Sequence, residues 1–149
     1  MQTFDRIIIA CVAAVFAVGC SSTPTKLSAA QPVPSERVYR TAQSTSQNPA
    51  RVVIVKDQGT WASFGYHQIF LNGKVVASIR TGERVEFLLD PADYIVGVLP
   101  VASTTTTEQS LGGYAVTSID QILVAGKTYY YRILVDGDNA SRIQRFVPE

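Results

Sequence analysis

Short runs of apolar or alternating residues, separated by turn-forming residues, make up most of the chain after residue 50. Such runs, of roughly four to eight residues each, are typical of β-strands, and no stretch has the period of an amphipathic helix. The predicted strands cover residues 51–56, 64–71, 74–80, 84–89, 94–99, 115–124, 128–136 and 141–147. This pattern predicts an all-β fold, a single antiparallel β-sandwich of immunoglobulin or transthyretin type with seven or eight strands.

The segment HQIFLNGKVVASI contains the clearest local signal, an Asn72-Gly73 pair between two apolar runs. This pair is typical of a type I′ turn, in which both central residues have positive φ. The turn predicts a β-hairpin in which Leu71 pairs with Lys74. Counting outward from this pair, each residue before Leu71 is expected to pair with the corresponding residue after Lys74. The predicted core face carries Tyr66, Phe70, Val75, Ala77 and Ile79, and the opposite, partly solvated face includes His67, Ile69 and Val76.

A different pattern marks the N-terminus, where residues 7–18, IIIACVAAVFAV, are all apolar. The run is shorter than the roughly 20 residues of a membrane-spanning helix but matches the central region of a signal peptide. The small residues Val18 and Gly19 lead into Cys20, and this ending resembles the lipobox of bacterial lipoproteins. The resemblance implies cleavage between Gly19 and Cys20, removal of residues 1–19, and acylation of Cys20 with fatty acyl chains such as palmitate. Ser21 after the cysteine implies the outer membrane, with the protein facing the periplasm.

Residues 21–50 are rich in Ser, Thr, Pro, Gln and Ala. Such a composition offers little apolar surface to offset the entropy of ordering. The sequence therefore predicts an acylated cysteine and flexible linker over residues 20–50, followed by the β-domain over residues 51–149. Residues 37–39, Arg-Val-Tyr, form a weak island within this segment and could instead add to the domain as an edge strand.

Charge and composition exclude several classes of function. The 13 basic residues nearly balance the 12 acidic ones and form no runs, which argues against nucleic-acid binding. The chain has a single histidine, His67, which excludes a histidine-rich metal site. His67 is expected at the surface, bonded to a neighbour.

Residues 136–139 begin like a calcium loop, but Ala140 stands where an oxygen ligand belongs, so a turn is expected. The sequence predicts a non-enzymatic protein with no cofactor and no metal.

Two longer segments carry a resemblance to a known group of proteins. They are IFLNGKVVASIRTGERVEFLLDPADYIVGV and the later AGKTYYYRILVDG. They resemble the small β-sandwich lipoproteins and PEGA-like envelope domains, a group that includes domains of unknown function. The resemblance implies a β-sandwich in the cell envelope and implies no activity.

These features predict a lipid-anchored envelope protein whose β-domain binds another envelope protein. Strand 51–56, taken as an edge strand, and the long loop 100–113 are the expected contact regions. The candidate binding residues are Trp61, Tyr66, Thr104, Thr105 and Thr106. The alternative is a module that binds peptidoglycan or another glycan through exposed aromatic residues near Trp61.

Overall fold

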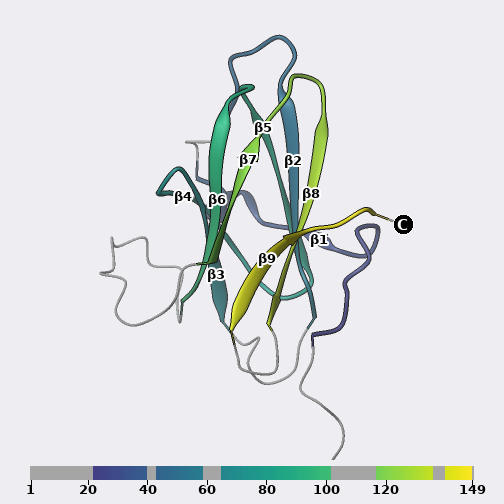
Figure 1. Cartoon of the computed structure of the whole chain (residues 1–149). Helices are drawn as coiled ribbons and strands as arrows, with labels where there is room; N and C mark the ends of the chain where they lie inside the picture. Colours follow the sequence, from purple (N-terminus) through teal and green to yellow (C-terminus); the bar gives the residue numbers. More distant parts are fainter. Residues whose placement is uncertain (1–21, 40–42, 59–64, 102–116, 136–139, 149) are drawn as a thin grey trace, which may run out of the picture.

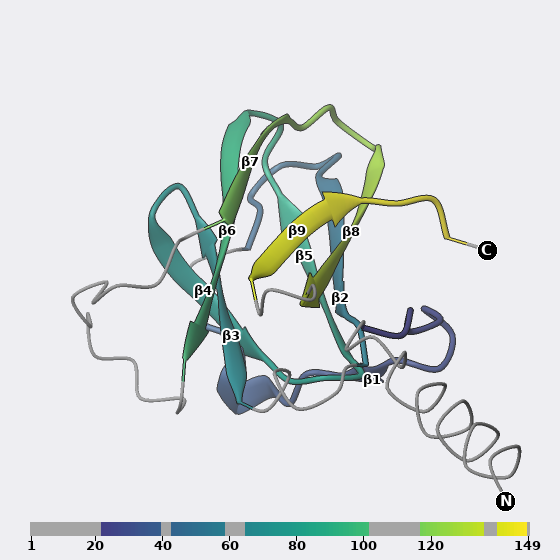
Figure 2. The same cartoon turned by 60° about the horizontal axis from the view of Figure 1, so that its bottom comes forward.

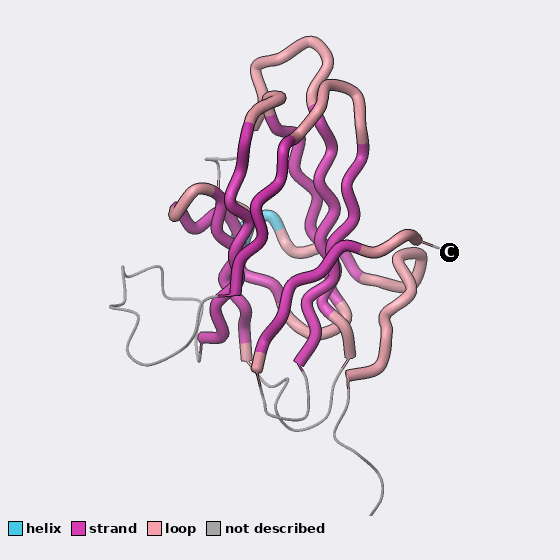
Figure 3. The backbone as a smooth tube through the Cα atoms, in the orientation of Figure 1, coloured by secondary structure: helices cyan, strands magenta, loops and turns pink. Residues whose placement is uncertain are grey.

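A computed structural model describes residues 22–39, 43–58, 65–101, 117–135 and 140–148. These residues form two β-sheets that face each other (Figure 1). The first sheet has the order β1 (Gln31–Pro32), β5 (Glu83–Leu89), β2 (Ala50–Lys56), β8 (Thr128–Val135) and β9 (Ser141–Arg145). The second has the order β4 (Lys74–Ile79), β3 (Tyr66–Leu71), β6 (Asp93–Val101) and β7 (Thr117–Ile122). Within the described residues, the helical structure is one short 3₁₀ turn, η2 (Ser35–Arg37) (Figure 3).

One hydrophobic core lies between the two sheets. The first sheet contributes Ile54 and Tyr131 and the second contributes Val96 and Val98, all with an exposed fraction of 0%. Alternate residues of β8 are buried, as expected for a strand with one face in the core. The prediction of an all-β fold is therefore confirmed.

The strand directions differ from the prediction. In the first sheet β2 lies between β5 and β8 and runs parallel to β8, with Arg51 opposite Thr128. The short β1 also runs parallel to β5. The predicted antiparallel arrangement is thus wrong for this sheet, and β2 is a central strand instead of an edge. The described residues contain nine strands, against the seven or eight predicted. Turn residues identify hairpins between neighbouring strands, but they carry no information about a strand that pairs with a distant one.

The β3–β4 hairpin has the predicted turn, with φ of 49° at Asn72 and 78° at Gly73. The predicted pairs Leu71–Lys74 and Phe70–Val75 are present. Beyond them the register shifts by one residue, so that Ile69 lies opposite Ala77. This irregularity is a β-bulge, in which one strand contributes an extra residue to the pairing.

The bulge also changes which residues of the hairpin are buried. Ala77 and Ile79 belong to the core as predicted. The other predicted core residues, Tyr66, Phe70 and Val75, are half-buried. The core instead takes Ile69 and Val76 from the face predicted to be solvated, and His67 of that face is buried too. A shift of one residue reverses the faces of a strand, so the prediction of the β3 face is wrong.

Residues 22–39, here called the N-terminal strap, lie against the two sheets (Figure 2). Its residues Thr25, Ala30 and Val33 are buried. Backbone N–H groups of the strap donate to the sheet edges, from Val33 to the carbonyl of Arg84 and from Tyr39 to that of Val76. Residues 37–39 therefore contact the domain, but not as an added edge strand, because Arg37 belongs to η2 and Val38 makes a single isolated bridge to Ala77. The predicted flexible linker is wrong for residues 22–39. The unpaired edges of strands supply hydrogen bonds, and these offset the entropy cost of ordering a polar segment.

Candidate functional site

The outer face of the second sheet carries two exposed isoleucines. Ile95 of β6 and Ile122 of β7 are 51% and 66% exposed. Asp93 lies opposite Ile122 and Ile95 lies opposite Asp120, so the two isoleucines are diagonal neighbours on one face. Side chains at this spacing are within reach of each other. We call Ile95 and Ile122 the isoleucine patch.

The isoleucine patch lies beside the end of the second sheet. Strand β7 is the last strand of that sheet. At its beginning the Thr117 hydroxyl donates to the carbonyl of Ser141 over 2.6 Å, which joins β7 to β9. Its other half carries the exposed Asp120 and Ile122. A terminal strand with an apolar side chain on its exposed face is a suitable place for a protein partner.

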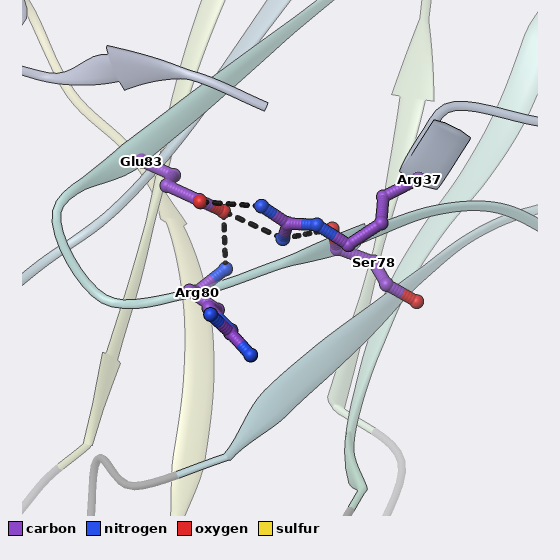
Figure 4. Close-up of polar contacts among 4 residues, drawn as sticks. All are labelled: Arg37, Ser78, Arg80 and Glu83. Atoms are coloured by element: carbon purple, nitrogen blue, oxygen red, sulfur yellow. Dashed lines mark hydrogen bonds and ion pairs between the residues drawn. The ribbon is translucent and has the colours of Figure 1, made fainter. Parts of the chain in front are cut away.

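An ion-pair cluster joins the strap to the two sheets at the side of β4 and β5, away from the isoleucine patch. Figure 4 shows this cluster. Arg37, in η2, donates from Nη1 and Nη2 to the two carboxylate oxygens of Glu83 over 2.8 and 2.6 Å. Arg37 Nη1 also donates to the carbonyl of Ser78 over 3.1 Å, and the Arg80 backbone N–H donates to Glu83 over 2.8 Å. A bidentate pair of this kind fixes both position and direction. The cluster therefore fastens the strap to β4 and β5 at once.

The charges of this cluster are mostly removed from water. The exposed fractions of the Arg37 and Glu83 side chains are 12% and 14%. Burial raises the pKa of Glu83, but the hydrogen bonds from Arg37 and from the backbone of Arg80 outweigh burial, so this pKa is lowered overall. The hydrogen bond to Glu83 raises the pKa of Arg37. Both side chains therefore stay ionised at neutral pH.

Tyr66, one of the predicted binding residues, is part of the same region. The guanidinium carbons of Arg80 and Arg37 lie 4.3 and 5.4 Å from the centre of its ring. Contacts of this kind are favourable cation–π interactions. Stacking of Tyr66 on a sugar would have to compete with these two cations.

A buried polar group lies at the end of the core where β2 ends and β3 begins. His67 Nε2 is 2.6 Å from Ser141 Oγ, and His67 is 2% exposed. Lys56 is 1% exposed and points into the same core. Burial lowers the pKa of His67 to about 3, with a further contribution from the charge of Lys56. Burial also lowers the pKa of Lys56 to about 8.

The His67–Ser141 pair lacks the features of a nucleophilic site. A histidine that activates a serine is itself held by a third group. The Nδ1 atom of His67 is buried and has no hydrogen-bond partner. The pair therefore fits a structural contact between β3 and β9. His67 is buried, so its predicted surface position is wrong.

A hollow of about 460 Å³ lies between the strap and the last residues of the chain. Arg132 and Lys26 line it together with Phe146. The Arg132 guanidinium is 3.4 Å from the Asp57 carboxylate and 4.4 Å from the centre of the Phe146 ring. Its Nε is buried without a hydrogen-bond partner. The charge of Arg132 in this hollow is thus partly balanced by Asp57.

Several predicted positions lie outside the described residues. These are Gly19, Cys20, Trp61, Thr104, Thr105, Thr106 and the turn at 136–139. In the part that the structure describes, no group of three or more His, Cys, Asp and Glu side chains is arranged to hold a metal. The same part contains no helix long and apolar enough to span a bilayer.

Sequence reasoning missed the isoleucine patch. A signal was present, because Ile119 and Ile122 are three residues apart in β7 and therefore point to opposite faces of the strand. Only Ile119 packs against the core.

Comparison with known proteins adds no assignment to this site. No protein family model matches the chain, and no curated protein matches it.

Proposed function

We propose that this chain is a lipid-anchored protein of the outer membrane, facing the periplasm, whose domain binds another envelope protein without catalysing a reaction. The anchor in this proposal is acylated Cys20, which ends the apolar run at residues 7–18. Two or more acyl chains hold a protein stably on a bilayer. The contact surface is the isoleucine patch.

The single observation that carries this proposal is the exposure of Ile95 on β6 and Ile122 on the terminal strand β7 as diagonal neighbours on one face. The strap covers the other side of both sheets, where it pairs with β5 of the first sheet and with β4 of the second. Exposed apolar side chains that are grouped mark contact sites for proteins. The half-buried Phe70, opposite Gly97 of β6, extends the apolar surface toward β3.

The strand order supports the transthyretin-type sandwich over the immunoglobulin type. Immunoglobulin domains place their first two strands in one sheet, with antiparallel neighbours. Here the neighbours β2 and β8 in the centre of the first sheet are parallel. We therefore include a transthyretin-like domain in the proposal.

Binding can be tested with the acylated protein in its own membranes. After chemical cross-linking and purification, the wild type is expected to recover one envelope protein at near-equal amounts. Ile122→Glu places a charge in the patch and is expected to reduce that recovery at least tenfold, because a desolvated charge is costly at an interface. Val147→Glu is the matched control, because Val147 is 89% exposed and lies outside the patch. Equal recovery with both variants would contradict the proposed surface.

The anchor has its own test. Cys20→Ser is expected to leave an unacylated precursor that keeps residues 1–19, detected by the mass of the intact protein. Normal cleavage and membrane retention of this variant would contradict the lipid anchor.

The glycan-binding alternative has less support. Of its proposed aromatic residues, the structure describes Tyr66, whose ring is engaged by Arg37 and Arg80.

A further inference from the structure

The strap is fixed to the domain almost from its first described residue. The Thr23 backbone N–H donates to the carbonyl of Gln58. Two residues later the Thr25 N–H donates to Asp57 Oδ1 over 3.0 Å, and the Thr25 hydroxyl accepts from the Gln58 N–H over 3.0 Å. Thr25 is 4% exposed. These contacts hold the chain at the end of β2.

Cys20 is therefore close to the domain along the chain. Three peptide units separate Cys20 from Thr23. A fully extended chain spans at most roughly 3.5 Å per residue, so Thr23 lies within about 10 Å of Cys20 in any conformation. A flexible linker of 30 residues would instead give an r.m.s. reach of about 30 Å.

The contact between Thr23 and Gln58 also identifies one end of the domain. Strand β2 runs from Ala50 to Lys56, and Gln58 follows at its far end. We call the end that carries Gln58 and Thr23 the anchored end; it is the lower end of the molecule in Figure 1. Residues 124–127 lie at the other end, because the Arg51 N–H at the start of β2 donates to the carbonyl of Lys127. The two ends are separated by the length of a seven-residue strand, about 23 Å.

We propose that the bilayer surface lies against the anchored end, so that the lipid anchor sets the orientation of the domain as well as its location. This inference rests on the proposed acylation of Cys20. The short connection keeps the end with Gln58 at the headgroup layer and directs residues 124–127 away from the membrane. Ile122, which pairs with Asp93 at the start of β6, is then on the half of the domain that faces the periplasm.

Energy transfer on vesicles tests the orientation. The acylated full protein is placed in phosphatidylethanolamine–phosphatidylglycerol vesicles with an acceptor dye on the lipid headgroups. A donor dye is attached at Gln58→Cys or at Ala125→Cys, two exposed positions at opposite ends, each combined with Cys11→Ser. Transfer is expected to be at least threefold more efficient from position 58. Equal or reversed efficiencies would overturn the proposed orientation.

A longer connection provides the control. A Gly/Ser insert of about 20 residues between Ser22 and Thr23 has an r.m.s. reach of roughly 25 Å and should abolish the difference between the two positions. A difference that survives the insert would also overturn the proposal, because something other than the short connection would then orient the domain. Flotation of the same vesicles separates the two proposals: protein that does not float contradicts the anchor, whereas floating protein with equal transfer contradicts only the orientation.

Discussion

The two sides of the domain are held together by different chemistry. On one side, the strap joins β4 to β5 through the ionised Arg37–Glu83 pair. On the other, β3 is joined to β9 by the neutral, buried His67–Ser141 contact. Both contacts weaken in acid, but the histidine side begins to lose stability below pH 6.5, whereas the Glu83 side does so only below the ordinary carboxyl pKa of 4.5. The two sides can therefore be weakened separately.

The largest change in the free energy of unfolding is expected in acid, and it comes from His67. Its pKa is about 3 in the folded protein, below its ordinary value of 6.5, so between these values the unfolded chain binds a proton that the folded protein does not. Stability is therefore full above pH 6.5 and falls as the pH drops toward 3, by about 4 to 5 kcal/mol in total. Urea unfolding of residues 21–149 across this range measures the loss.

His67→Gln is the matched variant for this prediction. Glutamine can still bond to Ser141 but does not titrate, so the slope of stability between pH 6.5 and pH 4.5 should become much flatter. A wild-type slope equal to that of the variant would show that another group causes the acid sensitivity.

Lys56 lies between the two sides and should give the next largest effect. Its pKa falls to about 8 on burial from the ordinary value of 10.5. The folded protein then loses a proton that the unfolded chain keeps, so stability rises as the pH goes from 8 to 10.5. At pH 7 the buried charge costs up to about 3 kcal/mol. Lys56→Met should recover part of this cost, seen as a higher midpoint of unfolding at pH 7 and no rise above pH 8.

Breaking the ion pair on the strap side should have a somewhat smaller effect. Arg37→Ala removes the guanidinium donors to the Glu83 carboxylate and the Ser78 carbonyl and leaves Glu83 with the Arg80 backbone N–H. Loss of charged hydrogen bonds in a mostly buried site should lower the free energy of unfolding by about 2 to 3 kcal/mol. Arg37→Lys should lower the free energy of unfolding by a smaller amount, because lysine keeps the charge but cannot make the bidentate contact. Faster cleavage by protease within residues 22–39 would show that the strap is released, and unchanged cleavage would contradict its role.

The smallest effect is expected for a similar pair that is open to water. Arg51 and Glu86 are 2.6 Å apart, but their side chains are 51% and 43% exposed. Arg51→Ala should therefore change the stability by less than about 1 kcal/mol in the same unfolding measurement. A loss as large as that of Arg37→Ala would show that burial does not set the strength of these pairs.

The sequence was most informative where structure depends on neighbouring residues. The Asn72-Gly73 turn and the approximate limits of the strands after residue 50 follow from local conformational preferences. The bulge near Ile69 was missed because it depends on how the hairpin packs on the core. The strap was missed because its composition is that of a linker, and its stability comes from edges formed by β4 and β5.

The candidate site was less predictable than the fold. Tyr66 could be chosen as an aromatic residue of a strand, but its contact with Arg37 joins positions that are far apart in the chain. The isoleucine patch depends on which face of β6 and β7 meets the core. Periodicity alone does not give that choice for strands with apolar residues on both faces, as in β6.

The parallel pairing of β2 with β8 also affects when the domain can fold. Arg51 pairs with Thr128, so the centre of the first sheet needs both an early and a late part of the chain. Contacts at such a separation slow folding, because a long loop must close before they form. A chain that is synthesised from its N-terminus makes β8 after every strand of the second sheet. The centre of the first sheet is therefore completed only once residues 128–135 are present, and a product that stops before residue 128 would lack the pairing of β2 with β8.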